Sequence, residues 1–123
     1  MVITGMGTVS PLGLDTPSTW NAALAGESGI DFIQSFDASE FPVRVAAEVK
    51  GFEPPDVVSP KEARRLDRNV LLAVEAGRQA LDDAGLVSHY QPRRVGIAFG
   101  SAIGGFLGIM EQHGIDPESR TAQ

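Results

Sequence analysis

The longest regular pattern in the chain is SPKEARRLDRNVLLAVEAGRQALDDAG, residues 59–85. It opens on a capping box, in which Ser59 and Glu62 cap each other's backbone and Pro60 occupies the first helical position. Apolar residues then recur at helical spacing on one face: Leu66, Val70, Ala73, Val74, Leu81 and Ala84. The pattern predicts one helix of about 25 residues that ends at Gly85.

Three apolar stretches on either side of this helix have the pattern of strands. Residues 1–4 and 95–99 are almost wholly apolar, which is typical of strands covered on both faces of a sheet. Residues 43–49 instead alternate, with Val43, Val45, Ala47 and Val49 on one side. This period of two predicts a half-buried strand.

Two shorter helices complete the predicted order of elements. The first has Thr16 as its N-cap and Pro17 at its first position, and it stops at Gly26. The second covers residues 106–113. The order strand, helix, strand, long helix, strand indicates a layered α/β fold.

The composition limits the classes of function. The chain has 123 residues, enough for one domain, and its net charge of −6 disfavours a general nucleic-acid binder, which needs a basic face. No apolar run is long enough to span a membrane and no secretory leader pattern is present, so we expect a cytoplasmic protein without a membrane partner. The absence of cysteine excludes disulfides, thiol nucleophiles and thiolate metal sites within this sequence, and we expect neither a metal nor a cofactor.

Two glycine-rich turns raise the question of a phosphate site. Gly5 and Gly7 fit the dinucleotide fingerprint imperfectly, and Pro11 interrupts the expected helix start. The second turn, SAIGG at residues 101–105, has no nearby basic residue to meet a phosphate. We therefore expect no nucleotide site at the first turn, and we interpret the second as a tight connection in which glycine supplies positive φ or close packing.

A basic cluster near the start of the long helix is the most informative group of side chains. It consists of Lys61, Arg64, Arg65 and Arg68. On one continuous helix, Lys61, Arg65 and Arg68 share a face, and the helix dipole opposes cations at this end. The cluster is either a solvated face neutralised by nearby acidic residues (Asp56, Glu62 and Asp67), or a docking patch for an acidic protein or a phosphorylated group.

Four segments, VITGMGTVSPLG, TWNAALAGESGI, ARRLDR and VGIAFGSAIGG, resemble in order and spacing the N-terminal part of elongating type II β-ketoacyl-(acyl-carrier-protein) synthases, in the thiolase superfamily. The resemblance covers residues 1–110 and leaves residues 111–123 as a divergent, loose tail. It implies an α/β chain that forms an incomplete portion of a thiolase-like αβαβα layered fold. It also implies a homodimeric enzyme that elongates fatty acyl chains by decarboxylative Claisen condensation with malonyl-carrier protein.

The resemblance assigns roles to both groups of residues. Ile103 matches the isoleucine that gates the acyl pocket, with Gly104 and Gly105 beside it. The basic positions match those that meet the acidic recognition helix of acyl carrier protein: Lys61, Arg64 and Arg65, with Arg68 extending the same face. Electrostatic steering of that partner weakens with salt.

The resemblance stops before the catalytic residues of the family. Its cysteine nucleophile and two histidines lie beyond the matched segment, and His89 and His113 fall where the family has no catalytic histidine. We therefore expect no catalytic residue and no activity in this chain alone, and exposed apolar surface where the rest of the fold is missing.

Three hypotheses follow: the N-terminal part of an elongating synthase, a non-catalytic carrier-binding or dimerising module related to polyketide chain-length factors, and an unrelated nucleotide-binding α/β domain. Affinity for acyl carrier protein would favour the first two. Affinity for a nucleotide would favour the third.

Overall fold

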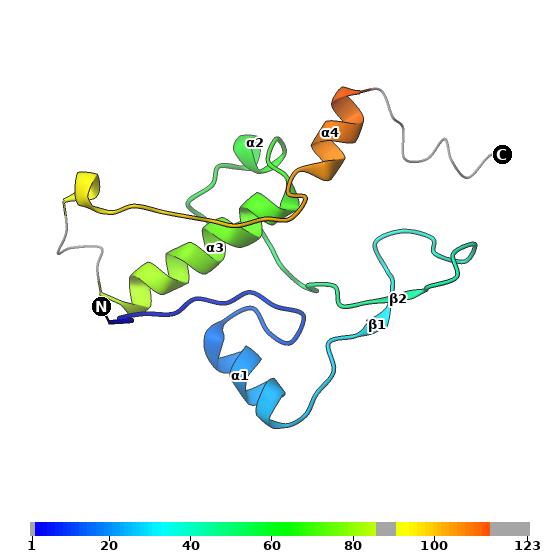
Figure 1. Cartoon of the computed structure of the whole chain (residues 1–123), viewed down its shortest axis with the longest axis horizontal. Helices are drawn as coiled ribbons and strands as arrows, with labels where there is room; N and C mark the ends of the chain where they lie inside the picture. Colours follow the sequence, from blue (N-terminus) through cyan, green and yellow to red (C-terminus); the bar gives the residue numbers. More distant parts are fainter. Residues whose placement is uncertain (1, 86–90, 114–123) are drawn as a thin grey trace. The chain divides into compact units, whose positions relative to one another are not determined.

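The computed structural model describes residues 2–85 and 91–113 (Figure 1). Its elements, in order, are α1 Thr16–Leu24, β1 Asp31–Phe32, β2 Val45–Ala46, α2 Pro60–Ala63, α3 Arg68–Asp83, the 3₁₀ helix η2 Pro92–Arg94, and α4 Phe106–Gln112. The chain forms two compact units: unit 1 is Met1–Glu53 with Glu75–Tyr90, and unit 2 is Pro54–Val74 with Gln91–Gln123. The first part of α3 therefore belongs to unit 2 and the rest to unit 1.

The predicted long helix is two helices. The capping box that starts it is confirmed, because Glu62 N donates to Ser59 Oγ at 3.3 Å and Ser59 N donates to Glu62 Oε2 at 3.1 Å. However, α2 ends at Ala63 and α3 starts at Arg68. The carbonyl of Asp67 accepts the amides of Val70 and Leu71 and so begins a new helix. The prediction of one helix was wrong because Leu66 keeps the apolar period across the break.

The ends of both longer helices agree with the predicted glycine stops. Gly26 follows α1 with φ +72°, and Gly85 follows α3 with φ +63°. The start of α1 differs from the prediction: Asp15, not Thr16, is the N-cap. Its carboxylate accepts Ser18 N at 2.7 Å, and Ser18 Oγ accepts Asp15 N at 3.3 Å. An aspartate is as good a cap as a threonine, and its pairing with Ser18 decides between them.

In unit 1, the N-terminal segment lies along the second half of α3 (Figure 1). A Cβ added to Gly5 would lie 2.5 Å from the carbonyl oxygen of Ala80, and one added to Gly7 would lie 2.6 Å from Ala80 N. These two glycines therefore allow close backbone packing between the N-terminal segment and α3. The predicted strand at residues 1–4 is wrong for residues 2–4, which pair with no strand.

The only sheet among the described residues pairs β1 with β2 in antiparallel register, Asp31 opposite Ala46 and Phe32 opposite Val45. The predicted strand 43–49 is thus reduced to two residues. Burial does not alternate along it either, because Val43, Val45 and Ala47 are exposed, whereas Ala46, Glu48 and Val49 are half-buried. Loop contacts decide this burial: the Glu48 carboxylate accepts Gln34 N at 2.9 Å.

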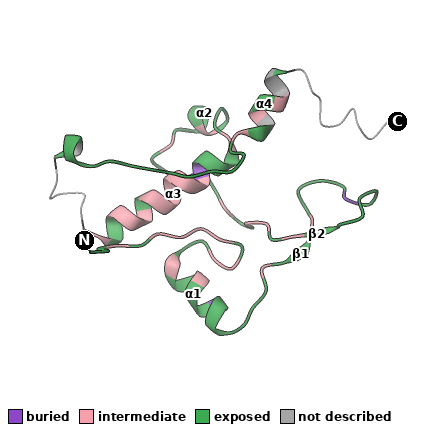
Figure 2. Cartoon of the chain, viewed as in Figure 1, coloured by how far each residue is buried: buried purple, intermediate pink, exposed green. Residues whose placement is uncertain are grey.

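Residues 95–99 form no strand, contrary to the prediction, and Ile97 is 78% exposed. A strand covered on both faces needs neighbouring strands, which the described residues do not supply. Four of the described residues are buried, and all are apolar: Ala22, Ala38, Pro55 and Leu71 (Figure 2). Many large apolar side chains among the described residues are exposed, among them Val2, Ile3 and Phe99. The expected exposure of apolar surface is confirmed.

No helix in residues 2–85 or 91–113 is long and apolar enough to cross a membrane.

Candidate functional site

The basic cluster and the glycine-rich turn both lie in unit 2. Lys61 is in α2, Arg64 and Arg65 follow it in the turn between the helices, and Arg68 is the first residue of α3. All four side chains are exposed. Because the helix is interrupted, the single helical face predicted for Lys61, Arg65 and Arg68 does not exist. Only Arg68 begins the long helix whose dipole opposes a cation at this end.

Most of the cluster is not neutralised by neighbouring acids. The ion pairs between described residues join Lys50 to Asp31, and Arg78 to Glu75 and Asp82. None involves Lys61, Arg64 or Arg65. Glu62 is instead held by Ser59, whose hydroxyl and amide lower the pKa of this carboxyl. In the described part of unit 2, these three cations remain available to an anionic partner.

A pocket of about 320 Å³ adjoins the cluster. Its lining is Val57, Val58, Glu62, Arg65 and Leu66. It is an open hollow in which apolar side chains adjoin one guanidinium, that of Arg65, and one carboxylate, that of Glu62. Sequence analysis missed this pocket, since its walls come from the connector before α2 and from the turn after it.

The glycine-rich turn packs against the start of α3. A Cβ added to Gly104 would lie 2.5 Å from Asn69 Nδ2, and one added to Gly105 would lie 3.0 Å from Asp67 Oδ2. Gly105 also has φ +79°, which glycine tolerates best. Ile103 is 70% exposed, so residues 2–85 and 91–113 do not enclose an acyl chain around it. Sequence analysis predicted this turn and the basic cluster separately and did not predict their contact.

No catalytic group stands out. The described residues contain no cluster of three acidic, histidine or cysteine side chains that could hold a metal ion. His113 follows α4 and is exposed, and its Nδ1 lies 2.9 Å from the carbonyl oxygen of Ile109. His89 lies outside the described residues.

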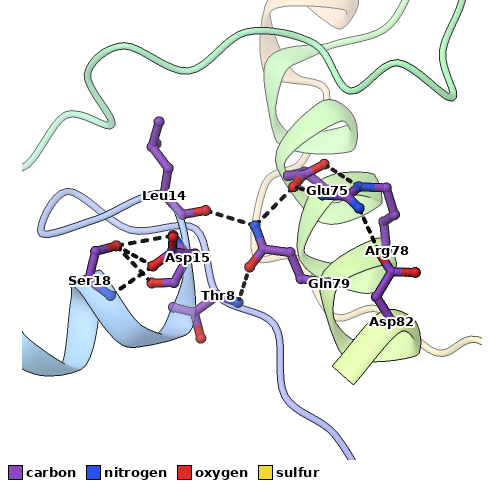
Figure 3. A network of polar contacts seen from close by, with 8 residues as sticks. All are labelled: Thr8, Leu14, Asp15, Ser18, Glu75, Arg78, Gln79 and Asp82. Carbon is purple, nitrogen blue, oxygen red and sulfur yellow. Dashed lines mark hydrogen bonds and ion pairs between the residues drawn. The ribbon is translucent and has the colours of Figure 1, made fainter. Parts of the chain in front are cut away.

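A second polar cluster, in unit 1, has a structural role (Figure 3). Gln79 accepts Thr8 N at 3.2 Å and donates to the carbonyl of Leu14 at 2.7 Å and to Glu75 Oε1 at 2.9 Å. Arg78 bonds Glu75 and, at 2.6 Å, Asp82; its hydrogen bond is the main cause of the lowered pKa of Glu75. Because this cluster bonds to the chain's own backbone and charges, it is not a candidate site.

Comparisons with known proteins agree on one family. Residues 1–122 match the family described as "Beta-ketoacyl synthase, N-terminal domain". The chain is 49% identical over 114 residues to "3-oxoacyl-[acyl-carrier-protein] synthase 2" of Coxiella burnetii, covering 92% of this chain and 28% of that protein. It is 46% identical over 114 residues to the synthase of the same name from Vibrio cholerae, with the same coverage. It thus spans little more than a quarter of these relatives.

Solved structures show the same likeness. The ishigamide ketosynthase/chain length factor superposes with a TM-score of 0.69 at 31% identity, covering 95% of this chain and 30% of that one. A β-ketoacyl synthase from Burkholderia phymatum gives a TM-score of 0.68 at 32% identity, covering 92% of this chain and 30% of that one.

Proposed function

Because the chain belongs to the β-ketoacyl synthase family, we propose that it is the N-terminal part of a 3-oxoacyl-(acyl-carrier-protein) synthase of the second type. The observation that carries the proposal is the 49% identity over 114 residues to a synthase of that name. The intact enzyme joins an acyl group to malonyl-carrier protein and releases carbon dioxide. It lengthens the acyl chain through a new carbon–carbon bond.

In this proposal the chain contributes binding surfaces and no catalytic residue. The sequence holds no cysteine to accept the acyl group, so the chain alone does not condense. Residues 1–110 form the first part of the thiolase-like αβαβα fold and residues 111–123 diverge from it. The intact protein is a cytoplasmic homodimer that needs no cofactor or metal and binds neither nucleic acid nor membrane.

We assign carrier docking to the basic cluster, Lys61, Arg64, Arg65 and Arg68. Three of these cations have no ion-pair partner in the described residues, and the protein as a whole is acidic. A local basic patch on an acidic protein orients an acidic partner toward that patch. The adjoining pocket, lined by Arg65 and Leu66 among others, would receive an apolar side chain of the carrier protein.

Carrier affinity tests the docking assignment. We expect the reversals Lys61→Glu, Arg64→Glu and Arg65→Glu together to weaken binding of acyl carrier protein by about tenfold or more at low salt. The affinity of the wild type should also fall as salt rises, more steeply than that of the variant. Arg44→Glu makes the same type of charge change in unit 1 and should leave affinity within about twofold. Equal loss in the control, or nucleotide binding without carrier binding, would overturn the assignment.

A polyketide ketosynthase or chain-length factor is the second candidate, because a ketosynthase/chain length factor superposes at a TM-score of 0.69. The intact native protein distinguishes the candidates. Its product with malonyl-carrier protein should be a single 3-oxoacyl group if it is a fatty-acid synthase. A product extended several times without reduction would indicate the polyketide function, and no product despite carrier binding would indicate a non-catalytic module.

A further inference from the structure

Asp67, which precedes α3, and Asn69, its second residue, lie against the glycine-rich turn and the glycine that follows it in α4. A Cβ added to Gly104 would lie 2.5 Å from Asn69 Nδ2, and Cβ atoms added to Gly105 and Gly108 would lie 3.0 and 3.2 Å from Asp67 Oδ2. Three glycines thus face two polar side chains that are separated by one residue. Segments more than thirty residues apart in sequence are in contact within unit 2.

The backbone conformation of the turn is consistent with these close contacts. Gly105 has φ +79°, a conformation that other residues adopt at a cost, and α4 begins at the next residue. The Asp67 carboxylate lies beside Gly105 and Gly108, next to the first turn of α4, where a negative charge is favourable. Moving Asp67 or Asn69 would therefore release the turn on the side where they contact it.

We propose that Asp67 and Asn69 are positioning residues that hold the turn at residues 101–105 and so set the place of Ile103. Ile103 immediately precedes Gly104, and its side chain is 70% exposed, so backbone contacts of the turn determine its position. The inference rests on the proposed function and on the expectation from the family resemblance that Ile103 lines the acyl pocket. In that enzyme, Asp67 and Asn69 would determine the acyl length accepted without touching the acyl chain.

The residue between them has a separate role. Arg68 is exposed and belongs to the basic cluster assigned to carrier docking. A change at Arg68 should therefore alter carrier binding, whereas a change at Asp67 or Asn69 should alter acyl selection. If these residues only supported the fold, changes at Arg68 and at its two neighbours would have the same kinetic effect. Different kinetic effects would therefore support the separate roles.

Hydrogen exchange on the intact native protein tests the contact without requiring activity. Asp67→Ala and Asn69→Ala should each accelerate amide exchange in residues 101–108 by about fivefold or more. Asp67→Asn keeps the shape of the side chain and should accelerate exchange less. Asp56→Ala removes an exposed acid of the same unit and should leave this segment unchanged. Unchanged exchange in both Asp67→Ala and Asn69→Ala would overturn the proposal.

Kinetics with acyl-carrier substrates of several lengths tests the consequence. Asp67→Ala should shift the ratio of kcat/KM between long and short acyl chains by about fivefold, and Arg68→Ala should raise KM for all lengths alike. Ile103→Ala tests the acyl pocket separately from the positioning role of Asp67 and Asn69. If Ile103→Ala leaves the ratio unchanged, the assigned acyl pocket fails. If it shifts the ratio while Asp67→Ala does not, only the positioning role fails.

Discussion

Unit 1 and unit 2 use charged side chains in opposite ways. In unit 1, Glu75, Arg78 and Gln79 bond to one another and to backbone groups of the same unit. In unit 2, Lys61, Arg64 and Arg65 form no ion pair with a described residue. Internal pairing, not the density of charge, thus separates a structural polar cluster from a surface available to a partner.

The glycines of the two units also differ, in the kind of atom that lies against them. Gly5 and Gly7 approach backbone atoms of α3, whereas Gly104 and Gly105 approach the ends of the Asn69 and Asp67 side chains. Helix backbone cannot move aside without breaking hydrogen bonds, but a side-chain end can rotate. The first contact therefore supports the fold, whereas the second holds the turn only as firmly as the Asp67 and Asn69 side chains are themselves held.

Gly7→Ala should have the largest effect on stability. The new methyl would overlap the carbonyl oxygen of Ala76 and lie 2.6 Å from Ala80 N, so the segment must separate from α3. We expect the free energy of unfolding to fall by about 3 kcal/mol, measured by chemical denaturation of the intact protein. Gly104→Ala should cost about 1 kcal/mol, because Asn69 can move. Gly96→Ala is the control, since nothing lies within 4 Å of its added Cβ. Equal costs at positions 7 and 104 would contradict the distinction between the two units.

Gln79→Ala should have an intermediate effect. It removes the acceptor of Thr8 N and the donor to the carbonyl of Leu14, and Thr8 is part-buried. The expected loss of unfolding free energy is about 1 kcal/mol. Gln34→Ala, at an exposed position, should stay within about 0.5 kcal/mol. Similar losses at the two glutamines would show that the network in unit 1 does not support the fold.

The two capping boxes allow the same change to be made in each unit. Asp15→Ala removes the cap of α1 and should lower the melting temperature by about 2–4 °C. Ser59→Ala removes the cap of α2, which has four residues and includes Lys61, so its main effect should be weaker carrier binding with little change in melting temperature. Calorimetry and binding measured on both variants check the contrast. The reverse pattern would place the structural role in unit 2.

The smallest effect is a pH dependence in unit 1. Hydrogen bonds from the Ser18 side chain and backbone lower the pKa of Asp15 in the folded protein. A lowered folded pKa means that this carboxylate stabilises the fold above its ordinary pKa of about 3.9 and stops doing so as pH falls through the folded value. The difference in melting temperature between wild type and Asp15→Ala should therefore shrink as pH falls below about 4. A difference that is constant with pH would argue against an ionised cap.

Local signals in the sequence predicted helix ends well, whereas apolar composition did not predict the strands. The Ser59 and Glu62 capping box, the stops at Gly26 and Gly85, and the helix α4 need only neighbouring residues, and all are present. The strands at residues 1–4 and 95–99 need partner strands, so apolar composition alone could not place them. The predicted site residues were found in one unit, while the break between α2 and α3 separated cations that a continuous helix would have aligned.

By itself, the sequence determined the Ser59 and Glu62 capping box, the glycine stops of the longer helices, the family and the position of the basic cluster, because each depends on residue types at short spacing. Only the tertiary structure decided that Gly5 and Gly7 lie on α3 and that Asp67 and Asn69 face the turn at Gly104 and Gly105. Those contacts join segments more than thirty residues apart, and no local propensity encodes which distant backbone will lie against a glycine.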